Sequence, residues 1–462
     1  MTMINTEPFG LSNSATENTP LHLMTVEQYS KWKKSANVKY KNWINATNFA
    51  ANPGETIYFS NNDGCIDFGI VVVGANPIWD GSKACEKLPK LNWKPVFSNN
   101  KNLLKDFVLG WGLAQYDFNK YRKNQKTKSN FLLLPNSIDI SDVVSQLSGT
   151  YLCRDLINHP PNFMNPDGLE EAAKTLCKNH KAEITVYKKG SLKNEFPAIN
   201  TVGRAAEFGP RLVEILWGKK GPKVTLIGKG ITFDTGGLDL KPSKGMELMK
   251  KDMGGAAVTL GLADALMTSK IKIQLRVLLP IAENAVSKKS MRPLDVIETR
   301  SGLEVEVGNT DAEGRLVIAD AITYAIEKKP DFFIDFATLT GAARVALGTE
   351  LPALFCNSED TAKGILKASE SQNDPLWRLP LFDDYDRHLD SGYAALSSTG
   401  VSAFGGAITA ALFLRRFAGK KSNWAHIDLM AWNLNSRPGR PKGGEAMGLR
   451  ALFSYISSLA KR

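Results

Sequence analysis

The segment Val224-Thr-Leu-Ile-Gly-Lys-Gly-Ile-Thr-Phe-Asp-Thr-Gly-Gly237 joins a short apolar run to a loop in which glycines surround a lysine and an aspartate. Its first four residues have the composition of a buried strand. Further apolar runs follow at 274–279, 303–307 and 332–336, and amphipathic segments typical of helices lie among them. Strands of continuous Val, Ile and Leu separated by helices indicate a mostly parallel sheet that helices cover on both faces.

This pattern extends over most of the chain after residue 160. We expect strands at 182–187, 224–227, 274–279, 303–307 and 332–336, and helices near 210–217 and at 256–267, 314–326 and 407–417. In sheets of this kind, binding sites form beyond the carboxyl ends of the strands. The loops that follow residues 227 and 307 are therefore the candidate positions for chemistry.

The length of the chain, 462 residues with 43% hydrophobic residues, predicts two domains. Residues 1–137 contain two short apolar runs, at 68–74 and 131–134, and are expected to form an N-terminal α/β domain of unassigned role. Residues 138–159 have apolar side chains at helical spacing and precede Pro160 and Pro161, which predicts a helical connector. Residues 160–462 are expected to form a larger C-terminal α/β domain that carries the chemistry.

The formal net charge of +11 could attract polyanions or an anionic membrane surface without specificity. The excess is not localised, however, and its densest runs, 33–41 and 120–128, are typical of solvated surfaces. We therefore expect neither a nucleic-acid partner nor a membrane partner, although a nucleic-acid-binding or regulatory protein remains the alternative that the charge suggests.

Cysteine usage and the N-terminus indicate a soluble cytoplasmic protein. The five cysteines are scattered and form no C-x-x-C pair, so neither a disulfide framework nor a thiolate zinc site is indicated. Residues 1–24 are polar and lack the features of a signal peptide. No apolar stretch approaches the roughly 18 to 20 residues that span a bilayer.

Four acidic side chains lie in loops that leave the carboxyl ends of expected strands. Asp234 and Asp252 follow the first strand, and the second loop reads Asn309-Thr-Asp-Ala-Glu-Gly-Arg-Leu316. If that loop is extended, Asp311 and Glu313 point the same way, because they are two residues apart. Converging carboxylates repel one another unless cations neutralise them, and oxygen ligands suit Mn²⁺, Mg²⁺ or Zn²⁺. Any one of these residues could simply cap a helix or shape a turn, but the combined pattern favours a two-cation site.

Other catalytic motifs do not fit. A dinucleotide-binding loop at Gly228 and Gly230 would need a small residue where Phe233 stands. The sequence contains no phosphate-binding G-x-x-x-x-G-K-[ST] loop and no G-x-S-x-G nucleophile elbow. None of its five histidines lies in an H-E-x-x-H zinc motif.

These segments resemble those of the leucyl aminopeptidase family, two-metal metallopeptidases whose signature N-T-D-A-E-G-R-L stands intact at residues 309–316. The likeness extends through Asp155-Leu-Ile-Asn-His-Pro-Pro, Thr338-Leu-Thr-Gly-Ala and Arg437-Pro-Gly-Arg-Pro-Lys-Gly-Gly, over about the last two thirds of the chain. It implies five metal ligands: Lys229, Asp234, Asp252, Asp311 and Glu313. Asp234 and Glu313 would bridge two divalent ions, Mn²⁺ or Zn²⁺, while Lys229 and Asp252 complete one site and Asp311 the other.

The resemblance also implies the remaining roles. Lys229 would be a neutral ligand, which burial and an adjacent dication can achieve by depressing its pKa. Lys241 would stabilise the oxyanion, and Arg315 would hold a bicarbonate ion that acts as general base. Thr338, Leu339 and Gly341 resemble the strand end that positions substrate, and Met249 could line a side-chain pocket or belong to the core.

The implied activity is removal of single residues from the free amino end of short peptides by a metal-activated hydroxide, with a leucine-type preference possible. One ion would bind the free amine of the substrate, which explains exopeptidase action. A homo-oligomer, a hexamer, is expected on the resemblance alone. A two-metal phosphatase is the other open alternative, but it leaves the lysine ligand unexplained. His426 and Asp428 are interpreted as structural groups at a strand end, and Cys356 as buried and inert.

Overall fold

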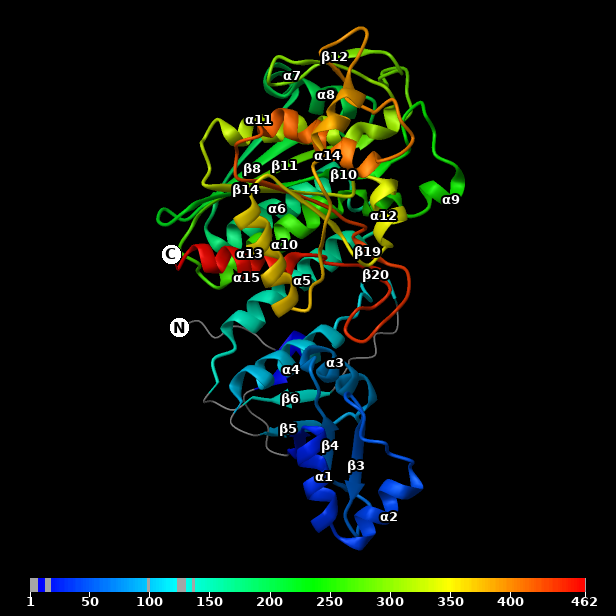
Figure 1. The fold of residues 1–462 in the computed structure, drawn as a ribbon, viewed down its shortest axis with the longest axis vertical. Coiled ribbons are helices and arrows are strands. Elements are labelled where there is room, and N and C mark those ends of the chain that lie inside the picture. Colours follow the sequence, from blue (N-terminus) through cyan, green and yellow to red (C-terminus); the bar gives the residue numbers. More distant parts are fainter. Residues whose placement is uncertain (1–6, 13–17, 98–99, 123–129, 135–137, 462) are drawn as a thin grey trace. The chain divides into compact units, whose positions relative to one another are not determined.

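The computed structural model describes residues 7–12, 18–97, 100–122, 130–134 and 138–461, which form two compact units (Figure 1). The N-terminal unit comprises Met1–Leu147 together with Asn435–Lys442. The C-terminal unit comprises Ser148–Leu434 and Gly443–Arg462. The division falls within helix α5 (Ser141–Asn158), at the position predicted for the helical connector. The domain boundaries at 137 and 159 remain predictions.

The N-terminal unit is built on a six-stranded sheet in the order β1-β6-β5-β2-β4-β3. All neighbours in it are parallel except β3 and β4, and β4 and β6 correspond to the two predicted apolar runs. The elements of this unit are η1 (Glu7–Phe9), β1 (Leu11–Ser12), β2 (Thr19–Met24), α1 (Val26–Ser35), α2 (Val38–Ala46), β3 (Thr56–Ser60), β4 (Ile66–Val72), α3 (Pro77–Lys87), β5 (Asn92–Val96), α4 (Lys101–Ala114) and β6 (Phe131–Leu133).

The C-terminal unit contains a nine-stranded sheet in the order β16-β15-β18-β14-β9-β11-β8-β7, with β10 also paired to β11. Its centre, β18-β14-β9-β11, is parallel throughout, which confirms the mostly parallel α/β fold predicted from the sequence. The strands are β7 (Glu183–Lys188), β8 (Arg211–Trp217), β9 (Lys223–Gly228), β10 (Gly230–Asp234), β11 (Gln274–Asn284), β14 (Phe332–Ala337), β15 (Ala353–Cys356), β16 (Trp377–Arg378) and β18 (Trp424–Asp428).

Helices cover both faces of this sheet, as its continuous apolar strands require. Phe332, Ile334 and Phe336 of β14 enter one hydrophobic cluster, with helices α6 (Pro166–His180), α10 (Gly254–Thr268), α13 (Glu359–Ser371) and α15 (Leu449–Leu459). Phe333, between them, enters a second cluster, with α8 (Pro197–Gly203), α11 (Glu313–Ile326) and α14 (Gly406–Ala418). The alternation follows the pleat of the strand, so two separate cores hold the sheet.

Short elements complete this unit. They are α7 (Lys189–Glu195), α9 (Ser243–Met246), η2 (Met249–Met253), η3 (Thr310–Ala312), α12 (Gly341–Leu347), η4 (Asp383–Leu389), a sheet of β12 (Val296–Glu298), β13 (Glu304–Glu306) and β17 (Leu396–Ser397), and the pair β19 (Trp432–Asn433) and β20 (Gly443–Gly444). Within the described ranges, no helix is long and apolar enough to cross a membrane.

Two sequence predictions about this unit were wrong. The helix predicted near 210–217 is strand β8, which lies between β7 and β11 in antiparallel pairings. A short apolar run fits a strand and a buried helix equally well. In the structure, the pairing of β8 with β11 is accompanied by an ion pair between Glu214 Oε1 and Arg276 Nε, which are 2.6 Å apart. The run at 303–307 forms β13, which belongs to the three-stranded sheet and not to the large one. The other expected strands and helices are present within a few residues of their predicted bounds.

Candidate metal centre

The candidate site lies at the carboxyl ends of the parallel strands β9 and β14. Lys229 stands between β9 and β10, and Asp234 is the last residue of β10. The backbone of Lys229 is fixed on both sides, because its N–H donates to Phe336 O at 3.0 Å and its carbonyl accepts from Ala256 N at 2.8 Å. Asp252 follows in η2, directly before α10. The fold therefore places the first loop where the sequence predicted chemistry.

Three carboxylates meet there. One oxygen from each of Asp234, Asp252 and Glu313 lies within 4.8 Å of the others, and all three side chains are buried. Asp311 joins the group through Lys241, whose Nζ contacts Asp311 Oδ1 and lies 2.8 Å from Asp234 Oδ2.

Lys229, the fifth predicted ligand, lies inside the cluster and is itself 3% exposed. Its Nζ is 2.7 Å from Asp252 Oδ2 and 2.9 Å from Glu313 Oε1, and it donates to Thr338 O at 3.1 Å. The structure thus brings together every side chain that the sequence singled out as a ligand.

The local conformation around Asp311 and Glu313 differs from the prediction. Asp311 lies in the 3-10 turn η3 and Glu313 begins α11, so this loop is not extended. Asn309 caps the turn by accepting from Asp311 N at 2.7 Å, which is why the chain bends here. The two side chains point to different neighbours: Glu313 faces Lys229 and is 1% exposed, whereas the Asp311 side chain faces Lys241 and is 34% exposed.

The electrostatics of the cluster favour added positive charge. Four carboxyl groups are paired with two lysine ammoniums, so ionisation of all four would leave an excess of negative charge in a largely buried site. Burial, aided by the charge of Asp234, raises the pKa of Glu313 to about 8 and that of Asp311 to about 6. Burial alone would lower the pKa of Lys229, but Asp252 and Glu313 outweigh it and raise that pKa. A dication at the cluster would displace protons from these groups, because it favours the carboxylates and the neutral amine.

The hydrogen bonds of the cluster also suit a cation. Within the described chain, Glu313 Oε2 accepts no hydrogen bond, whereas Asp252 Oδ2 and Glu313 Oε1 face the Lys229 ammonium at 2.7 and 2.9 Å. Buried carboxylate oxygens without such partners are costly, and metal coordination is a usual way to satisfy them. Hard carboxylate oxygens with one amine fit Mn²⁺ or Zn²⁺. The donor set therefore fits divalent metal ions.

Lys241 and Arg315, the predicted catalytic side chains, border the cluster from different elements. Lys241 is held by a hydrogen bond from its backbone N to Thr235 O at 3.0 Å. Arg315 lies on α11, where its Nη1 donates to Ser398 O at 2.7 Å and its buried Nε has no hydrogen-bond partner among the described residues. Burial lowers the pKa of Arg315 to about 10, although Asp428 and Glu313 act against it.

The residues predicted to position substrate lie at the end of β14. Thr338 is buried and its hydroxyl bonds to Asp252 Oδ1 at 2.7 Å, Leu339 follows it, and Gly341 begins α12. Met249 is the first residue of η2 and is buried, and its role in lining a side-chain pocket remains a prediction.

Asn284 is a site residue that the sequence reasoning missed. Its Nδ2 donates to Asp234 Oδ1 at 2.8 Å and to Thr310 O at 3.1 Å, so it ties the two loops together. The feature that could have revealed it is its position: Asn284 is the polar last residue of β11 and lies at the same edge of the sheet as Asp234. The predicted strand stopped at residue 279 and did not reach it.

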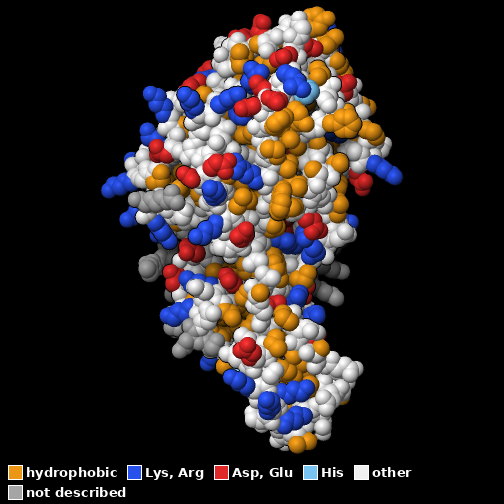
Figure 2. Space-filling view, in the orientation of Figure 1, with side chains coloured by type: hydrophobic (Ala, Val, Ile, Leu, Met, Phe, Trp, Pro, Cys, Tyr) orange, Lys and Arg blue, Asp and Glu red, His pale blue; other side chains and the backbone are white. Residues whose placement is uncertain are grey.

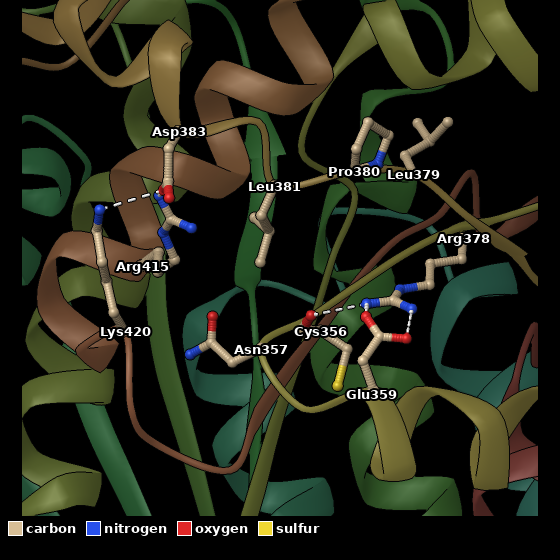
Figure 3. A pocket seen from close by; sticks show the side chains of 10 residues that line it. All are labelled: Cys356, Asn357, Glu359, Arg378, Leu379, Pro380, Leu381, Asp383, Arg415 and Lys420. Carbon is tan, nitrogen blue, oxygen red and sulfur yellow. Dashed lines mark hydrogen bonds and ion pairs between the residues drawn. The ribbon is translucent and has the colours of Figure 1, made fainter.

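A pocket of about 630 Å³ lies away from the cluster (Figure 3). Cys356 lines it, and Cys356 pairs with Ala425 near the start of β18, whereas the metal cluster is near the carboxyl end of that sheet. Each charged side chain in its lining is already in an ion pair, Arg378 with Glu359, and Arg415 and Lys420 with Asp383. Burial raises the pKa of Cys356, which keeps the thiol protonated and agrees with its interpretation as inert.

A helix-covered sheet that carries a buried carboxylate and lysine cluster at its carboxyl edge is suited to metal-assisted hydrolysis. Comparison with known protein families then identifies the chain. Residues 151–453 match the catalytic domain of the cytosol aminopeptidase family, and residues 19–135 match the M17 aminopeptidase N-terminal domain. The chain belongs to the cytosol aminopeptidase family and is a peptide hydrolase, which confirms the resemblance seen in its motifs.

Individual relatives support this assignment. The chain is 37% identical over 379 residues to a probable cytosol aminopeptidase of Geobacter sp. (strain M21), covering 78% of this chain and 77% of the relative. The crystal structure of a cytosol aminopeptidase from Coxiella burnetii matches with a TM-score of 0.92 and 41% identity, over 97% of this chain and 98% of that one. The bottromycin maturation enzyme BotP in complex with Mn matches with a TM-score of 0.87 and 28% identity, over 96% of this chain and 100% of that one.

Proposed function

We propose that this protein is an aminopeptidase that uses two divalent metal ions, Mn²⁺ or Zn²⁺, to remove the N-terminal residue of short peptides, with a preference of the leucine type. The observation that carries the proposal is the buried cluster in which oxygens of Asp234, Asp252 and Glu313 lie within 4.8 Å of one another beside the Lys229 amine. The manganese complex of the related enzyme BotP supports the choice of metal.

Two groups of contacts support two ion positions. Lys229 lies beside Asp252 and Glu313, and Lys241 lies beside Asp234 and Asp311. We assign Lys229 and Asp252 to one ion, Asp311 to the other, and Asp234 and Glu313 to both. Ions bound there would lower the pKa of a water molecule and polarise the scissile carbonyl.

The other residues of the site act around the reacting groups. We assign to Lys241 the hydrogen bond that stabilises the oxygen on which negative charge develops. Arg315 offers a buried N–H to a small anion, and bicarbonate as general base remains the predicted occupant. Thr338, Leu339 and Gly341 would hold the substrate backbone, and a free amino group would be needed at the metal.

We expect chelation to abolish hydrolysis of leucine p-nitroanilide, because the cluster then lacks the cations that its carboxylates require. Activity should return when Mn²⁺ or Zn²⁺ is added back, with metal content followed by elemental analysis. The same samples should be tested on p-nitrophenyl phosphate. Full turnover by protein shown to be metal-free contradicts the proposal, and hydrolysis of the phosphate ester alone favours the phosphatase alternative.

A cytoplasmic location is proposed from the names of its relatives, which are cytosol aminopeptidases. On the face shown in Figure 2, Lys and Arg side chains are interspersed with acidic and hydrophobic ones. The net charge of +11 is the feature that suggests the nucleic-acid-binding alternative.

Exposed hydrophobic residues support the predicted homo-oligomer. Tyr393, Val401 and Phe404, in the chain before α14, are 78%, 79% and 85% exposed, and Val345 on α12 is 90% exposed. The starts of α12 and α14 adjoin, because a Cβ at Gly406 would lie 3.2 Å from Ala342 Cβ. Neighbouring exposed apolar side chains often mark an interface between subunits.

We expect light scattering to give a hexamer, a mass of about six times the chain's 50.7 kDa. Phe404→Glu should lower this mass, because it places a charge among the exposed apolar residues. Val38→Glu is the matched control, since Val38 is 67% exposed on α2 of the N-terminal unit. A monomeric mass for the unmodified protein at micromolar concentration would show that the expectation is wrong.

A further inference from the structure

The carboxylate of Asp428 is bonded to the turn that borders the metal cluster. Asp428 is the last residue of β18, pairs in register with Ala337 at the end of β14, and is 3% exposed. Its Oδ1 accepts from Leu339 N at 3.0 Å and Thr340 N at 3.2 Å, and its Oδ2 accepts from the Thr340 hydroxyl at 2.6 Å. One side chain thus fixes the turn between β14 and α12.

A single peptide group connects Asp428 to Lys229. The peptide bond between Thr338 and Leu339 is trans, so its N–H and its C=O point in opposite directions. The N–H, from Leu339, donates to Asp428, while the C=O, from Thr338, accepts from Lys229 Nζ at 3.1 Å. The position of the Asp428 carboxylate therefore sets the direction of the carbonyl that holds Lys229.

The hydroxyl groups of this turn reinforce the connection. Thr338 Oγ1 is 2.7 Å from Asp252 Oδ1 and 2.9 Å from Asp252 O, so Thr338 contacts two predicted metal ligands. The Thr340 hydroxyl gives its proton to Asp428, which leaves its oxygen free to cap α12 by accepting from Ala343 N at 3.0 Å. Movement of this turn would shift both Asp252 and Lys229.

We propose that Asp428 is a positioning residue, which orients the Lys229 amine through the Thr338–Leu339 peptide and thereby sets the metal affinity of the site. The inference rests on the proposed function, because it requires Lys229 to be a ligand. A neutral amine held by one N–H bond has fewer directions open to its lone pair, and groups that orient ligands in this way typically change metal affinity or activity about 10- to 100-fold. Asp428 thus acts on the metal site and is not only a structural group at the end of β18.

Asp428→Asn tests the inference, because it keeps the size of the side chain and one oxygen for the two backbone N–H groups. It removes the charge and sets an amide N–H₂ against the Thr340 hydroxyl. We expect the metal-free variant to fold and to bind Mn²⁺ about 10- to 100-fold more weakly in a calorimetric titration, with a lower kcat on leucine p-nitroanilide. Thr340→Val, which removes only the hydroxyl, should weaken Mn²⁺ binding less, and Thr340→Ser should restore it.

Asp374→Asn is the matched structural control. Asp374 is also buried and accepts three backbone N–H bonds, from Gly448, Arg450 and Ala451 at 2.9 to 3.2 Å, but it belongs to another part of the unit. This variant should lower the unfolding temperature and leave Mn²⁺ affinity unchanged.

A double-mutant cycle separates the outcomes, because Asp428→Asn should no longer change Mn²⁺ affinity when Lys229 is already Met. The inference is overturned if folded Asp428→Asn protein keeps the Mn²⁺ affinity and kcat of the unmodified protein, or if its effect persists undiminished with Lys229→Met. Unmodified protein that binds neither Mn²⁺ nor Zn²⁺ overturns the proposed function and this inference with it.

Discussion

Asp311→Asn and Lys241→Ala are both expected to abolish useful turnover, but only Asp311→Asn should lower metal content. Asp311 is assigned as a ligand, and an amide oxygen in place of its carboxylate should weaken one ion. Lys241 is assigned to the developing oxyanion, and loss of such a donor typically costs about 10² to 10³ in kcat. Turnover of leucine p-nitroanilide and bound metal should be measured on the same samples.

The contacts of Lys241 sharpen this expectation. Its ammonium lies 2.8 Å from Asp234 Oδ2 and also contacts Asp311, so in the absence of metal it neutralises two assigned ligands. Lys241→Ala removes this competing cation, and the apparent affinity for Mn²⁺ should therefore stay the same or rise. Lys244→Ala is the control, because Lys244 is exposed in the same loop region, on α9.

The two results can contradict the assignment in different ways. If Lys241→Ala loses metal as Asp311→Asn does, Lys241 supports the ions and its assigned role is wrong. If Asp311→Asn keeps both ions and a near-normal rate, the second ion position is misassigned.

The sequence predicted the parts of the fold that depend on local pattern. The parallel sheet followed from runs such as 224–227 and 332–336, which are apolar except at Thr225 and Asp335 because both faces of the sheet are covered. Strand β8 was mistaken for a helix because its seven residues, the first five of them buried, show no periodicity that distinguishes a strand from a helix. Membership of β13 in a separate small sheet depends on pairing with β12 and distant β17, which local pattern cannot show.

The candidate site likewise contains residues that local pattern could predict and residues that it could not. Lys229 and Asp234 follow a strand that the sequence identified, so their place at the carboxyl edge of the sheet could be predicted, whereas Lys229 as a metal ligand rested on the family resemblance. The roles of Asn284 and Asp428 could not, since each acts through hydrogen bonds to chain 26 to 89 residues away. Such partners become visible only when neighbouring strands are known.

Gly314→Ala is expected to disable the site while leaving the fold intact. Gly314 is the second residue of α11, and a Cβ there would lie 2.4 Å from Lys229 Cε and 2.6 Å from its Nζ. In a helix interior, replacing glycine by alanine normally stabilises the helix by about 1 kcal/mol. Here the methyl group would occupy the space of the Lys229 amine, and because the end of a lysine side chain is flexible, Lys229 should move away.

That displacement would take Nζ from its position at 2.7 Å from Asp252 and 2.9 Å from Glu313. We expect reduced metal content and a turnover about 10²-fold lower, since misplacement of a catalytic group by about 1 Å can cost that much. Thermal unfolding of the metal-free protein should change by only a few degrees.

Gly392→Ala is the control without effect, because no atom lies within 4 Å of its added Cβ. Gly255→Ala is the opposite control: its Cβ would lie 2.0 Å from Phe336 O, a backbone atom that cannot move aside, so stability itself should fall. Normal metal content and rate in Gly314→Ala would show that the Lys229 amine is not needed where the structure places it.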